Sequence, residues 1–247
     1  MSLSRAGFVS RERSPTFATT AWNLVLKARS SEQQRELAIG ELCAAYWYPV
    51  YAFARRSGLI AADAEDATQS FFAWLLEGNA LDHADPARGR FRSFLITAFR
   101  QFLSRRREYE SAAKRCPERP ILSLHLEQGE PRYKREPCHD QTPERMFEYA
   151  WALSIIERAM SALRREWEQS GKGERFEALK STLNGSEPEK HRDLARQLNI
   201  SEGAVRVTIH RLRNRFGQLL RAEIGQTLES ERDIEEELQQ MMAALKL

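Results

Sequence analysis

Cysteine is scarce in this 247-residue sequence, and its few copies do not form an obvious set of pairs. Cys43, Cys116 and Cys138 are odd in number and widely spaced, which argues against a disulfide framework and for a reducing compartment. Cys138 and His139 lack the second pair of ligands that a zinc site requires. We therefore expect no metal, no cofactor and a cytoplasmic protein.

Long apolar runs are also missing. The longest, such as residues 71–76, are far shorter than the roughly 20 residues of a membrane span. Residues 1–20 carry three arginines but no apolar stretch of the kind found in a secretory signal. The sequence therefore predicts no membrane insertion, and we interpret residues 1–19 as a flexible tail.

No segment of any length alternates apolar and polar residues, so strands are not expected. A repeat of 3.6 residues dominates instead, which makes the predicted fold class all-α. Helices are predicted at residues 20–28, 33–57, 63–77, 90–115, 143–169, 174–184, 189–198, 201–224 and 230–245. The glycines that punctuate them are Gly58, Gly78, Gly171, Gly173 and Gly185.

Proline is thinly spread except in one stretch. Five of the nine prolines fall between residues 117 and 143, and because proline interrupts helices, residues 116–142 are predicted to be a Pro-rich linker without helix. Thr142, Pro143 and Glu144 then form a strong helix start. The predicted organisation is a helical domain at 20–115, the linker, a second helical domain at 143–226 and an acidic helix at 227–247.

The net charge of +3 conceals a strong pattern along the chain. Residues 88–119 carry a net +7 and residues 190–221 a net +6, whereas residues 229–247 carry a net −4. Two separated basic regions indicate two contacts with a polyanion. The ordinary alternative is a pair of solvated helix faces.

The downstream basic region, HRDLARQLNISEGAVRVTIHRLRNRF at 191–216, has the pattern of a helix-turn-helix. Its second helix carries an apolar face that is predicted to pack on the preceding helix: Val205, Ile209, Leu212 and Phe216. Ser201 is the expected N-cap. In such a motif the second helix enters the major groove, and the residues expected to face DNA are Ser201, Gly203, Arg206, Val207, His210, Arg211 and Arg213. Arg206 is expected to read a base, and Arg211, Arg213 and Arg215 to hold phosphates.

Two upstream segments carry further candidates. In DAEDATQSFFAWLL (63–76), Asp63 is the expected N-cap, and a core stripe leaves Asp66, Gln69 and Phe72 as an exposed docking surface. The ordinary alternative is that first-turn acids only complement the helix dipole. In RGRFRSFLITAFRQFLSRRRE (88–108), the predicted buried stripe is Phe91, Phe94, Leu95, Ala98 and Phe102. Arginines interleaved with aromatic residues suit phosphate binding and base stacking, although all the phenylalanines can equally belong to the core.

These segments, together with YWYPVYAFARRSG before them and LSLHLEQGEPRYKREP and TPERMFEYAWAL between them, resemble one family in their order and spacing. The family is the extracytoplasmic-function (ECF) group of bacterial RNA polymerase sigma factors, in the branch abundant in planctomycetes. The resemblance covers residues 22–226. The linker is longer than is usual in the family, and the acidic helix at 227–247 lies outside its pattern.

The resemblance implies a promoter-recognising transcription factor of two helical domains, sigma regions 2 and 4. Region 2 would bind the β′ clamp of core polymerase through Asp66, Gln69 and Phe72. It would also melt and hold the −10 element through Arg90, Phe91, Arg92, Arg100, Gln101 and Arg105. Region 4 would read the −35 element through its helix-turn-helix and contact the β flap. The resemblance admits an anti-sigma factor as a further partner, and implies no small-molecule substrate.

Two other functions are compatible with parts of the sequence. A stand-alone helix-turn-helix regulator would bind duplex DNA without polymerase, and the stripe of Ile234, Leu238, Met241 and Leu245 could supply its dimer interface. A hydrolase could be built on helical carboxylates with His83 and Asp85, but no nucleophile elbow, phosphate-binding glycine loop or metal-ligand set is present. We therefore do not expect an enzyme.

Overall fold

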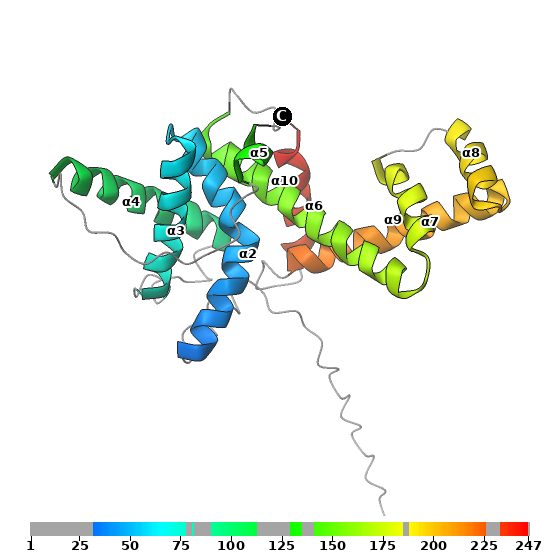
Figure 1. Cartoon of the computed structure of the whole chain (residues 1–247), viewed down its shortest axis with the longest axis horizontal. Helices are drawn as coiled ribbons and strands as arrows, with labels where there is room; N and C mark the ends of the chain where they lie inside the picture. The colour runs from blue at the N-terminus through cyan, green and yellow to red at the C-terminus, as the bar shows by residue number, and fades with distance from the viewer. Residues whose placement is uncertain are drawn as a thin grey trace, which may run out of the picture.

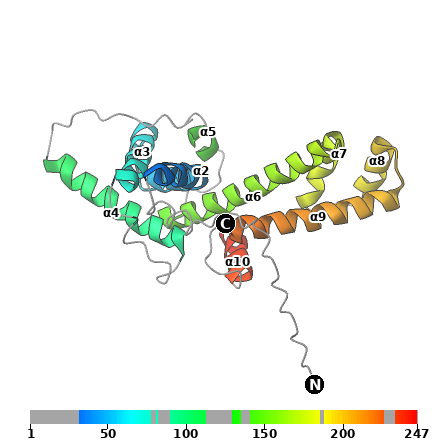
Figure 2. The same ribbon diagram turned by 90° about the horizontal axis from the view of Figure 1, so that it is seen from below.

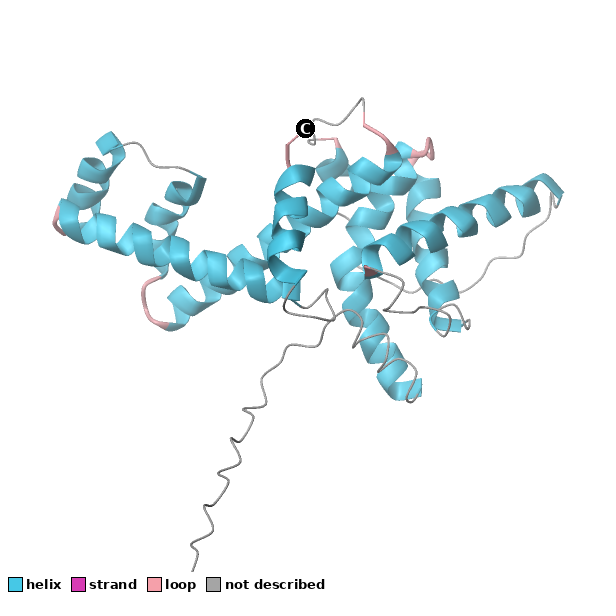
Figure 3. Cartoon of the chain, turned by 180° about the vertical axis from the view of Figure 1, so that it is seen from behind, coloured by secondary structure: helices cyan, strands magenta, loops and turns pink. Residues whose placement is uncertain are grey.

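Helices are the only regular structure in the described part of the computed structural model, which comprises residues 32–77, 81, 90–112, 129–134, 141–184, 188–225 and 233–246. Figure 3 shows helices and loops throughout this part of the chain. The predicted all-α class is confirmed for these residues. No described helix is long and apolar enough to cross a membrane.

The helices lie close to their predicted positions. They are α2 (Glu32–Arg56), α3 (Ala61–Glu77), α4 (Phe91–Ala112), α5 (Gly129–Tyr133), α6 (Pro143–Gln169), α7 (Gly173–Leu179), the 3-10 helix η3 (Lys180–Asn184), α8 (Pro188–Leu198), α9 (Glu202–Gly225) and α10 (Ile234–Ala244). The helix predicted at 20–28 lies outside the described residues. Asp63 was expected to cap α3, but the helix begins at Ala61 and Asp63 lies in its first turn.

Local signals fix several of these helix ends. The Thr142 hydroxyl accepts a hydrogen bond from the Arg145 amide at 3.3 Å, and Pro143 follows it as the first helical residue, as predicted. Gly58 and Gly171 have φ angles of 93° and 69° just after α2 and α6. Glycine adopts this left-handed conformation without a steric penalty, so it commonly ends a helix.

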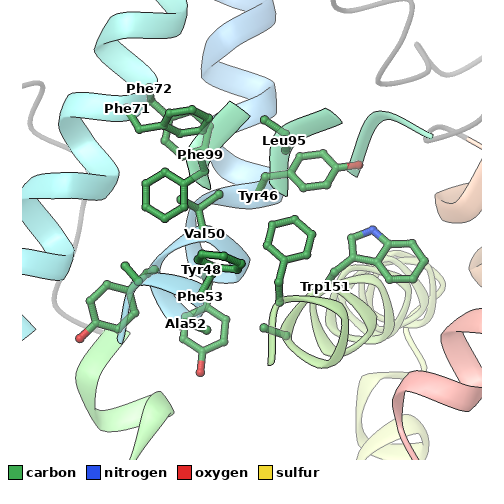
Figure 4. Close-up of a cluster of buried hydrophobic side chains, with 14 of the residues drawn as sticks. Tyr46, Tyr48, Val50, Ala52, Phe53, Phe71, Phe72, Leu95, Phe99 and Trp151 are labelled. Atoms are coloured by element: carbon green, nitrogen blue, oxygen red, sulfur yellow. The ribbon is translucent and has the colours of Figure 1, made fainter. Parts of the chain in front are cut away.

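A first apolar cluster joins α2, α3, α4, the first half of α6 and α10. Tyr51 and Phe71 are fully buried in it, and the Phe71 and Phe99 rings meet edge to face with centroids 4.9 Å apart. Figure 4 shows how Phe71, Phe72 and Phe99 from α3 and α4 gather beside α2. Trp151 of α6 lies in the same cluster.

A second apolar cluster joins the end of α6 to α7, α8 and the first half of α9. Its buried residues include Leu163, Phe176, Val205 and Leu212. Leu194 and Ala195 of α8 pack against this face of α9, as the sequence predicted for a helix-turn-helix.

The long helices α6 and α9 run between the two clusters in opposite directions (Figures 1 and 2). Arg158 of α6 pairs with Glu223 of α9 at 2.8 Å, and Arg215 of α9 pairs with Glu166 of α6. The two clusters therefore meet within α6, and not at residue 142 where the sequence analysis put the domain boundary. The reason is the apolar first half of α6, which packs on α2.

The predicted linker contains one short helix. Glu130 of α5 accepts hydrogen bonds from the Tyr51 hydroxyl at 2.6 Å and from the Arg55 guanidinium at 2.9 and 3.0 Å. A side chain at position 129 would meet the Trp47 ring at 2.8 Å, so only glycine permits this close approach. The expectation of a helix-free linker is thus wrong at residues 129–133, since Pro131 lies in the first turn, where no amide donor is needed.

Candidate nucleic-acid interface

The turn between α8 and α9 has a geometry set by its own sequence. Asn199 has a φ of 50°, and the amides of Asn199 and Ile200 donate to the carbonyls of Arg196 and Ala195 at 3.3 and 3.0 Å. This is the hydrogen-bond pattern of a Schellman motif, in which asparagine is tolerated at the left-handed position. Ser201 then accepts a hydrogen bond from the Ala204 amide at 3.2 Å, as predicted for the N-cap of α9.

The two faces of α9 are clearly divided. Val205, Ile209 and Leu212 are buried against the second cluster, and Phe216 is partly buried there. The opposite face points to solvent, and its exposed residues are Gly203, Arg206, Val207, His210, Arg211 and Asn214. The geometry therefore brings most of the predicted DNA-facing residues of α9 onto one open surface at one end of the molecule (Figure 1).

The arginines on this face form few and weak ion pairs with the rest of the described chain. Arg206 approaches Glu202, one helical turn earlier, at 3.7 Å with both side chains exposed, a contact that contributes little to stability. Arg211 forms no ion pair with a described residue. Both guanidinium groups are thus available to an external anion.

Two arginines that were expected to hold phosphates make internal contacts instead. Arg213 donates through Nε and Nη2 to the carbonyl of Thr182, in the middle of η3, at 3.2 and 2.6 Å. Arg215 pairs with both oxygens of Glu166, at 2.9 and 2.5 Å, and lowers the pKa of that carboxyl below its ordinary value. Both residues are exposed, but in this conformation their guanidinium groups are engaged by η3 and α6.

The docking surface expected on α3 is only partly exposed. Asp66 is exposed and pairs with Arg106 of α4 at 2.7 Å, and Gln69 is half-buried. The expected exposure of Phe72 is wrong, because its side chain is 1% exposed and stacks edge to face with Phe71. Packing of α3 against both α2 and α4 widens its buried face beyond the single predicted stripe.

The buried stripe predicted for α4 is confirmed in part. Phe91, Leu95 and Ala98 are buried as predicted, Phe94 and Phe102 are only partly buried, and Phe99 and Leu103 join the stripe. Phe91 is 1% exposed and meets the Tyr46 ring edge to face at 5.4 Å, so in this conformation it cannot stack on a −10 base in the way that the resemblance implied.

Arg92 was expected to project from the core towards DNA, and this is wrong for the described conformation. Its side chain is 5% exposed and pairs with Glu148 of α6 at 2.8 Å and with Glu237 of α10. The guanidinium lies 4.3 Å from the centre of the Trp151 ring, and its Nη2 donates to Gln240 at 2.7 Å. Burial lowers the pKa of Arg92, and the Glu148 carboxylate opposes that change.

Later residues of α4 remain on the surface. Arg100 pairs with Glu144 at the start of α6, and both side chains are solvent-accessible. Gln101 and Arg105 are exposed, and Arg105 makes no ion pair with a described residue. These three side chains form an open polar edge on α4.

The sequence analysis missed the acid that neutralises Arg92. At 100° per residue, Glu237 falls on the same face of α10 as Ile234 and Met241, and it is 1% exposed there. An acid within an apolar stripe requires a buried partner, so this position was a usable signal. Glu148 and Trp151 gave no comparable signal, because they meet Arg92 only through the packing of α4 on α6.

His83 and Asp85, the candidates for a hydrolase, lie outside the described residues. Within the described residues, no group of three or more histidine, cysteine, aspartate or glutamate side chains could hold a metal ion. Comparison of the chain with protein-family models, curated proteins and solved structures found no match.

Proposed function

We propose that the chain is a promoter-specificity factor of bacterial RNA polymerase, a cytoplasmic sigma factor of the ECF group, and that it has no enzymatic activity. The observation that carries the proposal is the exposed face of α9, where Arg206 and Arg211 stand opposite the buried face of a helix-turn-helix. Such a face suits the major groove, with arginine reading guanine or holding phosphate.

A second polar surface supports binding to a promoter, which has two separate DNA elements, over binding to one DNA site. Arg100, Gln101 and Arg105 are exposed on α4, which belongs to the first apolar cluster. The start of α9, which carries Arg206 and Arg211, lies at the far end of α6 (Figure 2). In the proposal this edge contacts the −10 element and the α9 face contacts the −35 element. Asp66 and Gln69 on α3 are the contacts to the β′ clamp, and Phe72 supports them from within the core.

The alternative function is that of a stand-alone regulator. It requires two copies to match paired half-sites, and α10 carries the apolar stripe that could join them. That stripe already packs on the chain's own first cluster, with Met241 only 1% exposed. The described surface therefore favours a factor that binds DNA as part of a larger enzyme.

A promoter library that varies the upstream element tests which DNA contacts the exposed face of α9 makes. Arg206→Ala should relax preference at one upstream position, since a bidentate base contact contributes ~1–3 kcal/mol of discrimination. Arg211→Ala should lower output on all sequences and reduce the salt dependence, as expected for a phosphate contact. Arg175→Ala on α7 is the matched control, because Arg175 is exposed and forms no ion pair with a described residue.

The comparison has clear outcomes. Uniform loss with Arg206→Ala would make Arg206 a phosphate contact and remove its base-reading role. If Arg206→Ala and Arg211→Ala both behave like Arg175→Ala, the α9 face does not touch the promoter and the proposed function fails.

A further inference from the structure

The acidic helix α10 lies across the beginning of α4. Glu236 accepts from Arg90 Nη2 at 2.7 Å, and Arg90 Nε pairs with Glu237 at 2.7 Å. Glu237 also pairs with Arg92. Two carboxylates thus occupy both arginines at the N-terminal end of the basic segment of α4.

We propose that α10 is an internal competitor of nucleic acid at this site. Its carboxylates take the positions that backbone phosphates would occupy on Arg90 and Arg92, because a guanidinium fork binds carboxylate and phosphate by the same paired hydrogen bonds. The inference rests on the proposed function and deepens it, since it makes binding at the start of α4 dependent on displacement of α10.

Contacts beyond the ion pairs hold α10 in place over this site. Met241 is buried in the first cluster, and Ile234, Leu238 and Leu245 are partly buried against it. This accounts for the apolar stripe. It also means that the site is covered by a docked helix and not by a loose acidic tail.

The two arginines differ in how accessible they are while α10 is docked. The Arg90 side chain is 29% exposed, so an incoming anion can reach it first. Arg92 is enclosed by Glu148, Glu237 and Trp151. When α10 leaves, the Nη1 and Nη2 of Arg92 lose Glu237 and Gln240 and become available, whereas its Nε stays paired with Glu148 of α6. Arg90 is therefore where competition begins.

The length of α10 favours reversible docking. It has 11 residues, fewer than the ~12–15 that an isolated helix needs to be even marginally stable in water. Its helical state depends on the contacts described above. Release of α10 is thus coupled to its unfolding, and its affinity for α4 falls as salt screens the ion pairs.

A matched pair of substitutions on α10 tests the competition. Glu236 and Glu235 are 64% and 65% exposed. Glu236 pairs with Arg90, just before α4, and Glu235 pairs with Arg221 of α9. Glu236→Gln and Glu235→Gln remove the same charge from adjacent positions on the surface. Only the first removes a carboxylate from Arg90, which then keeps its pair with Glu237 alone.

The readout is the affinity of the full chain alone for a fluorescently labelled single-stranded oligonucleotide, measured by anisotropy. Glu236→Gln should raise the affinity roughly two- to fivefold, the range expected for one partly exposed ion pair, and Glu235→Gln should not. Deletion of residues 229–247 should raise it further and steepen its salt dependence. In an Arg90→Ala background the effect of Glu236→Gln should disappear.

Equal affinities for the two glutamine variants would overturn the inference, as would an absence of oligonucleotide binding by every variant. Run-off transcription with core polymerase tests the proposed function separately. A chain that transcribes while the two variants behave alike loses only the inference. A chain in which Glu236→Gln binds more tightly but no variant supports transcription loses only the proposed function.

Discussion

At the scale of single residues, the structure separates side chains that can touch a partner from those that position others. Phe72 and Phe91 were expected at binding surfaces and are both 1% exposed. Arg206 and Arg211 were expected on an open face and are exposed there. Phe72 and Phe91 lie on faces of α3 and α4 that point into the first cluster, whereas Arg206 and Arg211 lie on the side of α9 opposite Val205, Ile209 and Leu212.

Phe72 is predicted to matter for stability first. Phe72→Ala should lower the free energy of unfolding by ~3–5 kcal/mol, since it leaves a cavity in a packed aromatic cluster. Gln69→Ala, one turn away and half-buried, should change it by less than about 1 kcal/mol. Chemical denaturation of the two variants checks this. A Phe72→Ala protein as stable as its parent would place the ring at the surface after all.

Asn199 is predicted to control the helix-turn-helix through its backbone. Its φ of 50° costs a residue with an ordinary side chain ~1–2 kcal/mol, so Asn199→Ala should destabilise the second cluster by about 1 kcal/mol. Asn199→Gly should be neutral or stabilising, because glycine adopts this conformation freely. Thermal unfolding of both variants distinguishes them, and equal losses would mean that the Asn199 side chain matters for another reason.

At the scale of elements, helix ends were predictable and helix docking was not. The start of α6 follows from Thr142 and Pro143, and its end from Gly171, because capping is decided by a few adjacent residues. The pairing of Arg92 with Glu237 depends on two helices far apart in the sequence, so no local pattern gives it. The α5 helix was not predicted for two reasons. Its segment contains proline, which is typical of a stretch without helix, and the residues that bind Glu130, Tyr51 and Arg55, lie far away in the sequence on α2.

The α5 contact is predicted to weaken in acid. Desolvation favours the neutral form of Glu130, but hydrogen bonds from Tyr51 and Arg55 outweigh it and lower the pKa of this carboxyl below its ordinary 4.5. Its stabilising contribution is therefore present above pH 4.5 and is lost as the pH falls through the lowered value.

Glu130→Gln should accordingly reduce stability at neutral pH, and the difference from the parent should shrink in acid. Unfolding free energies measured from pH 7 to about pH 3 check this. Glu157→Gln is a suitable control, since Glu157 also pairs with α5, through Arg132 at 2.9 Å, and is more exposed than Glu130. A difference between Glu130→Gln and parent that stays constant across this range would show that the charge of Glu130 does not hold α5.

At the scale of the whole molecule, α6 and α9 connect the helices of the first apolar cluster to those of the second. Both helices contribute to both apolar clusters. The ion pairs Arg158–Glu223 and Arg215–Glu166, the latter beside the second cluster, also join α6 to α9. The sequence analysis predicted two helical domains joined by a Pro-rich linker at residues 116–142. In the described residues, the antiparallel pair of α6 and α9 connects the helical group that contains α4 to the exposed face at the start of α9 (Figure 1).

This connection predicts cooperative unfolding. The chain has five tryptophans, of which Trp151 lies in the first cluster and Trp167 packs on the second. Two single-tryptophan variants, in which only Trp151 or only Trp167 remains and the other four are replaced, therefore report on each cluster separately. Their denaturation midpoints should coincide if the helical pair couples the clusters. An earlier transition at Trp167 would mean that the second cluster unfolds independently and that α6 does not transmit stability between them.

The central claim, that this chain directs RNA polymerase to promoters, is tested most directly by reconstitution. Purified chain is titrated into bacterial core polymerase, and the complex is used for run-off transcription on a genomic fragment library. We predict a stable complex and transcripts from discrete start sites, with both weakened by the double substitution Asp66→Ala, Gln69→Ala and with promoter choice altered by Arg206→Ala. A chain that binds duplex DNA but neither associates with core polymerase nor changes its transcripts would contradict the account and would support a stand-alone regulator.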